Sequence, residues 1–302
     1  MTEISSDNNP STETTTTTTT NSTCNPSSTI QAEEVLIKNG KPLAKLDPNH
    51  ALRSFSLGER IKGGRSILKL TNLIQPDEID TLVKSSLAAA EERKGGSTEP
   101  ILEQDDPNRV LIRLLPTATA QRENAPQDAL PEPVSQLMEE ILERALTFLD
   151  QQVCPSVRTT LFGDDCSSMA ALLRDNQLEY SNREPAINVY EAPHGHFNMH
   201  KDHHALSIVM PLSVPAKDFK GGGTAFWSQS HPIQGMDSPS IVLKPPPGTA
   251  MVWGGRVSHK GVRITQGTRV VFVASFSGPN TPDDVRARLS AGMGLRTVLS
   301  GR

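Results

Sequence analysis

Residues 249–276 read TAMVWGGRVSHKGVRITQGTRVVFVASF, and this stretch decides the fold. Two runs rich in β-branched and aromatic residues, 249–253 and 269–276, are separated by glycine-containing turns. The second run is apolar at every position from Val270 to Ala274, which is typical of a strand buried on both faces. The stretch therefore predicts two strands of a buried β core.

Similar short runs, each bounded by Gly, Pro or Ser, predict further strands at 186–190, 206–212, 224–227 and 241–243. Regular turn signals with no helical period between them indicate an all-β sandwich or barrel. Earlier in the chain, apolar residues at helical spacing predict helices from Pro76 to the Gly95-Gly96 pair and over about 133–153. We expect an α+β chain with a mainly β core and supporting N-terminal helices.

Composition divides the chain into four regions. The N-terminal part contains an unbroken threonine run, Thr14–Thr20, and lacks core-forming side chains, so we expect it to be disordered. Thr281 and Pro282 are suited to the N-cap and first position of a short helix. The expected regions are a disordered tail at 1–34, a helical support region at 35–180, the β core at 181–280, and a C-terminal helix and tail at 281–302.

Charge and composition exclude several classes of protein. The 302 residues carry a net charge of −4 and only 4% are aromatic, which disfavours nucleic acid as a partner. No apolar segment reaches the ~18 residues of a membrane span, and the N-terminus does not resemble a secretory signal. The three cysteines show no CxxC spacing. We therefore expect an intracellular protein, cytoplasmic or nuclear, with no membrane contact.

A small set of side chains carries the chemistry of the β core. His200 and Asp202 stand two residues apart, so in extended backbone both side chains point the same way. His259 follows a different predicted strand and can complete a set of three ligands. Two histidines and a carboxylate suit a ferrous ion with open positions, whereas a closed zinc site usually has four ligands with thiolates. Arg269, ten residues later, can hold the far carboxylate of a 2-oxo dicarboxylic acid.

Other histidines in this region are weaker candidates. His194 and His196 also stand two residues apart, but this pair lacks the carboxylate that oxygenases use. His203 and His204 are expected to be neighbours of the ligands or to face solvent.

The ordered motif set resembles a known family. The segment from Ala186 to Ser277 resembles the iron- and 2-oxoglutarate-dependent dioxygenases, specifically their prolyl 4-hydroxylase-like branch. It covers about a third of the chain. The residues that carry the resemblance are Tyr190, Gly195, Phe197, His200, Asp202, Gly222-Gly223-Thr224, Phe226, Pro247-Gly248, His259, Gly267 and Arg269.

The resemblance implies a fold and a set of residue roles. The fold would be a double-stranded β-helix, or jelly roll, and the cofactors Fe(II) and 2-oxoglutarate, with ascorbate as a further candidate. It implies that the distal carboxylate of 2-oxoglutarate pairs with Arg269 and Tyr190, in a pocket lined by Thr224. Arginine at 269 replaces the lysine of many prolyl hydroxylases. The implied iron ligands and catalytic residues are His200, Asp202 and His259.

The implied reaction uses dioxygen to hydroxylate an unactivated C–H bond and releases succinate and carbon dioxide. The expected substrate is a peptidyl proline, another protein side chain or a small molecule. Two alternatives stay open. One is a nucleic-acid demethylase with the same iron chemistry, and the other is a catalytically silent metal-binding jelly-roll module that serves in interactions.

Overall fold

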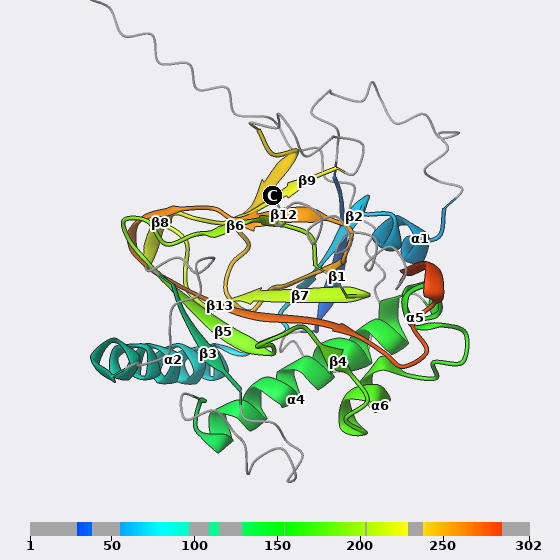
Figure 1. The fold of residues 1–302 in the computed structure, drawn as a ribbon, viewed down its shortest axis with the longest axis horizontal. Helices are drawn as coiled ribbons and strands as arrows, with labels where there is room; N and C mark the ends of the chain where they lie inside the picture. The colour runs from blue at the N-terminus through cyan, green and yellow to red at the C-terminus, as the bar shows by residue number, and fades with distance from the viewer. Residues whose placement is uncertain are drawn as a thin grey trace, which may run out of the picture.

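The computed structural model describes residues 29–37, 55–96, 109–114, 129–153, 155–202, 204–228 and 238–285. Two antiparallel sheets face each other across a shared interior (Figure 1). The larger sheet has the strand order β1-β2-β11-β7-β13-β5-β3, with β4 and β8 also paired to β13. The smaller sheet has the order β10-β9-β12-β6. This arrangement is the predicted double-stranded β-helix.

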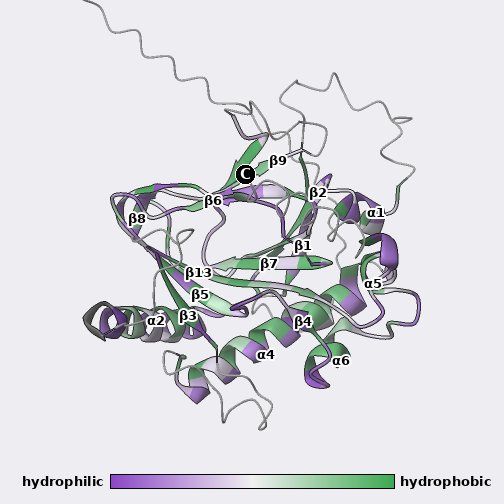
Figure 2. Cartoon of the chain, in the orientation of Figure 1, coloured by the Kyte–Doolittle hydropathy of each residue, from purple (hydrophilic) through white to green (hydrophobic). Residues whose placement is uncertain are grey.

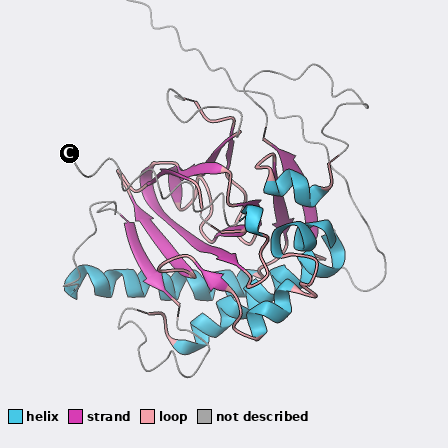
Figure 3. Cartoon of the chain, turned by 45° about the vertical axis from the view of Figure 1, so that its right-hand side comes forward, coloured by secondary structure: helices cyan, strands magenta, loops and turns pink. Residues whose placement is uncertain are grey.

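The helices lie along the outer face of the larger sheet, as Figures 1 and 3 show for α2 and α4. The helices are α1 Leu57–Lys62, α2 Pro76–Gly96, α4 Glu132–Phe148, α5 Pro155–Phe162 and α6 Met169–Arg174, and a π-helical turn, η2 Leu149–Val153, continues α4. The strands are β1 Gln31–Leu36, β2 Ser66–Thr71, β3 Arg109–Arg113, β4 Glu179–Tyr180, β5 Ala186–Glu191, β6 Phe197–His200, β7 Leu206–Pro211, β8 Phe219–Gly221, β9 Thr224–Trp227, β10 Ile241–Leu243, β11 Ala250–Gly254, β12 Ser258–Gly261 and β13 Ile264–Ser277.

Strand β13 confirms the prediction from its apolar run. It pairs with β5 along one edge and with β7 along the other, so it is a central strand. Side chains alternate between the two faces of a strand. Phe272 therefore packs with the helix-side core, while Val271 packs with the core between the two sheets. Both faces are covered, which explains why no polar residue interrupts this run.

Helix α4 confirms the second predicted helix. Its apolar stripe, including Met138, Leu142 and Leu146, is buried against the larger sheet. Figure 2 shows hydrophobic and hydrophilic bands alternating along this helix, as expected when one face is covered. The buried stripe joins the core that contains Phe272 of β13. Helix and sheet therefore share one apolar interior.

The structure differs from the sequence prediction at the N-terminal side. Strand β1 begins at Gln31, so the boundary expected at residue 34 falls inside a strand. The region expected to be a helical support, 35–180, also contributes β2 and β3 to the larger sheet. These strands are short and lack a clear alternating pattern, and pairing with distant strands stabilises them. At the other end, helical backbone begins at Asp283, and the expected helix beyond Val285 lies outside the described residues.

None of the helices in the described part of the chain is both long enough and apolar enough to cross a membrane.

Candidate metal centre

Two histidines meet on the smaller sheet. His259 of β12 is directly paired with His200, the last residue of β6, and their ring centroids are 4.2 Å apart. Directly opposite residues of an antiparallel pair present their side chains on the same face. The ring of His259 is enclosed, with 9% of its side chain exposed, whereas 33% of the His200 side chain is exposed. The site is therefore accessible from the His200 side.

Asp202 completes the group. It lies in the loop just beyond β6, with Oδ1 3.3 Å from His200 Nε2 and Oδ2 3.7 Å from His259 Nε2. One ligand atom from each of the three residues lies within 4.8 Å of the other two. The predicted i, i+2 pair is thus close together, although Asp202 belongs to a loop rather than a strand.

A glycine allows this loop to approach the turn before β12. A Cβ built at Gly255 would lie 2.0 Å from the carbonyl oxygen of His204 and 2.9 Å from that of Asp202. Any side chain at 255 would therefore displace the backbone that carries Asp202. Gly255 brings the carboxylate and His259 together by close backbone approach.

Backbone carbonyls orient both imidazoles. The Nδ1 of His200 lies 2.8 Å from the carbonyl oxygen of Asn198, and the Nδ1 of His259 lies 3.1 Å from that of Val257. A carbonyl can only accept, so Nδ1 carries the proton and donates it in each contact. Nε2 then presents its lone pair towards the other residues of the group, as a metal ligand requires.

The protonation states also suit a cation. Burial lowers the pKa of His259 to about 4, against the opposing effect of the Asp202 charge. Burial alone would raise the pKa of Asp202, but the two histidines and the Ser207 hydroxyl outweigh it and hold that pKa well below its usual range. At neutral pH the group therefore contains a carboxylate and a neutral, buried imidazole. Metal ligands need these forms.

A buried arginine lies in the same interior. Arg269 on β13 is only 4% exposed, and its Nη2 donates to the Thr224 hydroxyl over 3.2 Å. Its Cζ lies 5.6 Å from the ring centroid of Tyr190, the residue directly opposite on β5. The structure therefore brings the three predicted cosubstrate residues together. Burial lowers the pKa of the Arg269 guanidinium, and no acidic side chain of the described segments forms an ion pair with it.

The alternative histidines lie outside the group. The His196 Nδ1 is 2.8 Å from the carbonyl oxygen of His194 at the turn between β5 and β6, where His194 is exposed and His196 is half-buried. His204 Nδ1 lies 3.4 Å from the Ser277 hydroxyl. His203 lies outside the described residues.

Sequence reasoning missed the side chains that support the ligands. The Ser207 hydroxyl donates to Asp202 Oδ2. On the opposite side, the Trp253 ring packs edge-on to His259 with centroids 4.8 Å apart. Trp253 was expected in the core, but its contact with a ligand was not predicted. For Ser207, one signal was present: it is the only polar residue in the otherwise apolar strand β7.

No protein-family model and no curated protein matches the sequence. Solved structures with a similar chain path include a 2OG-Fe(II) oxygenase-family oxidoreductase from Burkholderia pseudomallei, with 17% identity, 77% of this chain and 93% of that chain covered, and a TM-score of 0.40. The viral collagen prolyl hydroxylase of Paramecium bursaria Chlorella virus-1 is 11% identical over 72% of this chain and 97% of that chain, with a TM-score of 0.41. The dioxygenase for auxin oxidation in rice is 16% identical over 74% of this chain and 79% of that chain, with a TM-score of 0.45.

Because these three TM-scores are 0.45 or lower, function has to rest on the side chains of the site. Those side chains are a carboxylate and two imidazoles placed for a cation, with a buried guanidinium in the same interior.

Proposed function

We propose that this chain is an Fe(II)- and 2-oxoglutarate-dependent dioxygenase that hydroxylates an unactivated C–H bond. In the balanced reaction, one dioxygen, one 2-oxoglutarate and one substrate yield the hydroxylated substrate, succinate and carbon dioxide. The observation that carries the proposal is the buried Arg269, which has no ion-pair partner among the described residues and lies in the interior next to the His200, Asp202 and His259 group. A buried charge without a counter-ion is unfavourable by several kcal/mol, so this arginine is suited to a ligand carboxylate.

The donor set fits ferrous iron. Two imidazole nitrogens and one carboxylate oxygen are the ligands of the non-haem iron oxygenases. His200, Asp202 and His259 would hold the metal, and three protein ligands leave further positions for the cosubstrate. Zinc in a structural site is usually enclosed by four protein ligands. The exposed edge of His200 argues against such a closed site.

Arg269 and its neighbours fit the far end of 2-oxoglutarate. The guanidinium is planar and can donate two parallel hydrogen bonds to a carboxylate. Thr224 holds one nitrogen of the guanidinium, and the Tyr190 ring lies beside it. We assign all three residues to cosubstrate binding, with the carboxylate at Arg269.

The remaining residues organise the reaction. When bound, iron and 2-oxoglutarate together supply the oxidising chemistry for hydroxylation. Ser207 and the two backbone carbonyls fix the ligand orientations before the cofactors bind. Trp253 and Phe226 cover the buried side of His259 and exclude water there. The substrate would approach from the exposed side of His200, and we retain a peptidyl side chain or a small molecule as its class.

The test is succinate formation from 2-oxoglutarate with ferrous iron and ascorbate, without a prime substrate. Enzymes of this kind turn over 2-oxoglutarate slowly when uncoupled, so no substrate needs to be guessed. His200→Ala should abolish both turnover and iron binding. Arg269→Ala should lose turnover at the 2-oxoglutarate concentration that suffices for the wild type and regain it at higher concentrations. His196→Ala removes a half-buried imidazole outside the group and is the matched control.

Absence of both turnover and iron binding in the wild type would contradict the proposal. In that case the silent jelly-roll module would be the better description.

A further inference from the structure

Strand β3 carries two arginines on the face that lines the site. Along this strand Val110 and Ile112 pack with the helix-side core, so Arg109 and Arg113 point to the opposite face. Arg109 is directly opposite Tyr190 of β5, which in turn is opposite Arg269. The edge strand therefore adds two further cations to the sheet face that carries Tyr190 and Arg269.

A ring contact locates Arg109 relative to the metal ligands. Its Cζ lies 4.4 Å from the ring centroid of Phe197, the first residue of β6. The Phe197 ring is itself 4.4 Å, edge-on, from the ring of His200. Arg109 thus lies at the level where β6 begins, on the side from which the site is accessible.

Arg113 lies four residues beyond Arg109 on β3, and its distance along the strand from the turn between β5 and β6 is similar to that of His200 on β6. The chain turns between β5 and β6, with the Gly195 amide donating to the Glu191 carbonyl, while β3 runs antiparallel to β5. Both β3 and β6 therefore lead away from this turn in the same direction. At about 3.3 Å per residue, β3 advances ~13 Å from Arg109 to Arg113, and β6 advances ~10 Å from Phe197 to His200.

Two polar side chains on this face of β3 and β5 contain a buried atom that has no hydrogen-bond partner among the described residues. Arg113 makes no hydrogen bond or ion pair with any residue that the structure describes, and its Nε is buried without a partner. Asn188 is 4% exposed, and within the described part of the chain its Oδ1 also has no hydrogen-bond partner. Asn188 is opposite Leu111, two residues from Arg113 on the same face, and Arg113 is opposite the small side chain of Ala186. Buried polar groups are normally hydrogen-bonded, so an unused donor and acceptor together indicate a ligand subsite.

We propose that Arg113 binds a carboxylate of the prime substrate and that Asn188 accepts a hydrogen bond from an N–H or O–H of the same molecule. This inference rests on the proposed function, because it assigns the accessible side of the His200 group to the substrate. The substrate is then an acid with a nearby hydrogen-bond donor. A free amino or hydroxy acid and the C-terminal residue of a peptide share this chemistry.

The binding test uses the full chain with manganese in place of iron, without dioxygen, and with saturating 2-oxoglutarate so that Arg269 is already paired. The probes are free amino acids, hydroxy acids and short peptides, each compared with its primary amide. A ligand that binds only the folded state raises the melting temperature. The melting temperature of the wild type should rise either with free acids or with peptides that end in a carboxylate. The corresponding primary amides should not raise it.

Variants separate this subsite from a general effect of charge. Arg113→Gln should weaken binding of the stabilising acid roughly 10- to 100-fold, because a charge-assisted hydrogen bond is lost. Arg113→Lys should restore part of the affinity, and Asn188→Leu should remove the preference for a ligand with a donor. Arg158→Gln is the matched control, because Arg158 also has a buried, unpartnered Nε but lies on α5.

The outcomes distinguish the two proposals. If no acid stabilises the wild type more than its amide, or if Arg113→Gln binds acids as the wild type does, the subsite assignment is wrong. Succinate formation with iron, measured without any acid from the panel, reports separately on the proposed function. If the protein turns over 2-oxoglutarate but does not distinguish acids from amides, the proposed function stands and the subsite assignment is wrong.

Discussion

At the scale of single residues, each reactive side chain of the site is held by one neighbour. Ser207 holds the carboxylate of Asp202, a backbone carbonyl holds each imidazole, and Thr224 holds Arg269. Most of these contacts are local or come from the paired strands, so the geometry exists before any ligand binds. Such pre-organisation reduces the entropy that binding has to offset.

Glu184 is a partly buried carboxyl near this group, and it should make stability depend on pH. Desolvation raises the pKa of Glu184 to about 7, with a smaller contribution from the charge of Asp202, while Ser275 lowers it. Between about pH 4.5 and 7 the folded state therefore binds more protons than the unfolded state. Stability then falls as the pH rises through this window.

We expect Glu184→Gln to remove this loss, because glutamine can still accept the hydrogen bond from the Ser275 amide without ionising. Relative to wild type, the variant should gain stability from pH 5 to pH 8, by at most about 3 kcal/mol. Urea unfolding of the metal-free protein at several pH values measures this gain. Glu92→Gln, at an exposed position of α2, controls for the loss of one carboxylate. Parallel pH curves for wild type and Glu184→Gln would show that the carboxyl does not titrate in this window.

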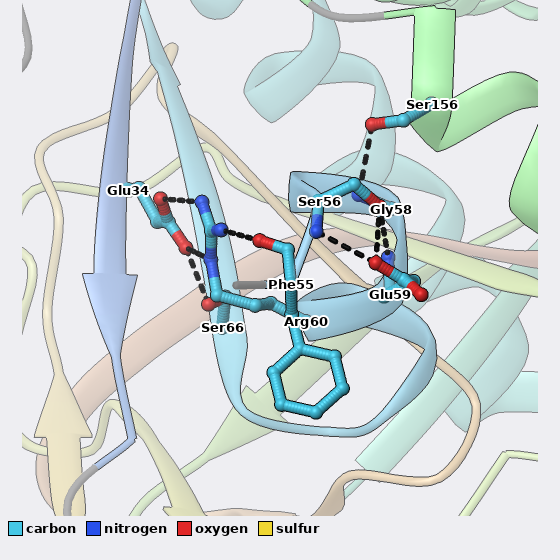
Figure 4. A network of polar contacts seen from close by, with 8 residues as sticks. All are labelled: Glu34, Phe55, Ser56, Gly58, Glu59, Arg60, Ser66 and Ser156. Carbon is cyan, nitrogen blue, oxygen red and sulfur yellow. Dashed lines mark hydrogen bonds and ion pairs between the residues drawn. The ribbon is translucent and has the colours of Figure 1, made fainter. Parts of the chain in front are cut away.

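At the scale of elements, α1 is joined to the larger sheet by a polar network (Figure 4). The Arg60 guanidinium makes two hydrogen bonds of 2.7 Å to the Glu34 carboxylate on β1. Ser66 of β2 donates to the same carboxylate. At the start of the helix, Ser56 and Glu59 form a capping box. The network ties a helix of only six residues to strands that precede and follow it.

Replacing Arg60 with Met should destabilise the fold by about 1–3 kcal/mol, because it leaves the partly buried Glu34 without its bidentate partner. Chemical denaturation measures the change in the free energy of unfolding. Arg174→Met removes an ion pair to Glu143 in which the two side chains are 54% and 36% exposed. This control should change stability by less than ~1 kcal/mol. Equal effects of the two variants would mean that the Arg60 network does not stabilise the fold.

At the scale of the whole molecule, the helices and the larger sheet share one core. Leu142 of α4, Leu70 of β2 and Phe272 of β13 belong to the same buried cluster. Strands from before residue 181 lie at both edges of the sheet, β1 and β2 at one edge and β3 at the other, and β11, β7, β13 and β5 lie between them. We therefore expect residues on both sides of the predicted boundary to unfold together.

Leu142→Ala should lower stability by about 2–4 kcal/mol, because the side chain is 2% exposed and its removal leaves a cavity. The change lies in α4, yet it should shift the unfolding midpoint reported by the fluorescence of the two tryptophans, Trp227 and Trp253, as much as that reported by far-UV circular dichroism. Leu87→Ala, on α2 and 37% exposed, is a surface control. Two separate transitions would instead support a division near residue 181.

Much of the fold and the site could be predicted because the signals are local. The apolar run of β13 and the stripe of α4 identify their elements through the period of their side chains. The spacing of His200 and Asp202 predicts that their side chains lie close together. The short strands β2 and β3 were not predicted, because distant partners stabilise them and their own sequences carry little signal.

The sequence by itself determined the chemical types at the site: two imidazoles, a carboxylate and a guanidinium, carried on or beside strands of a β core. Only the tertiary structure decided which groups surround them. Ser207 reaches Asp202, Trp253 packs on His259, and β3 brings Arg113 to the wall of the site. The physical reason is that side-chain period follows from local backbone geometry, whereas strand register is selected by packing over the whole core.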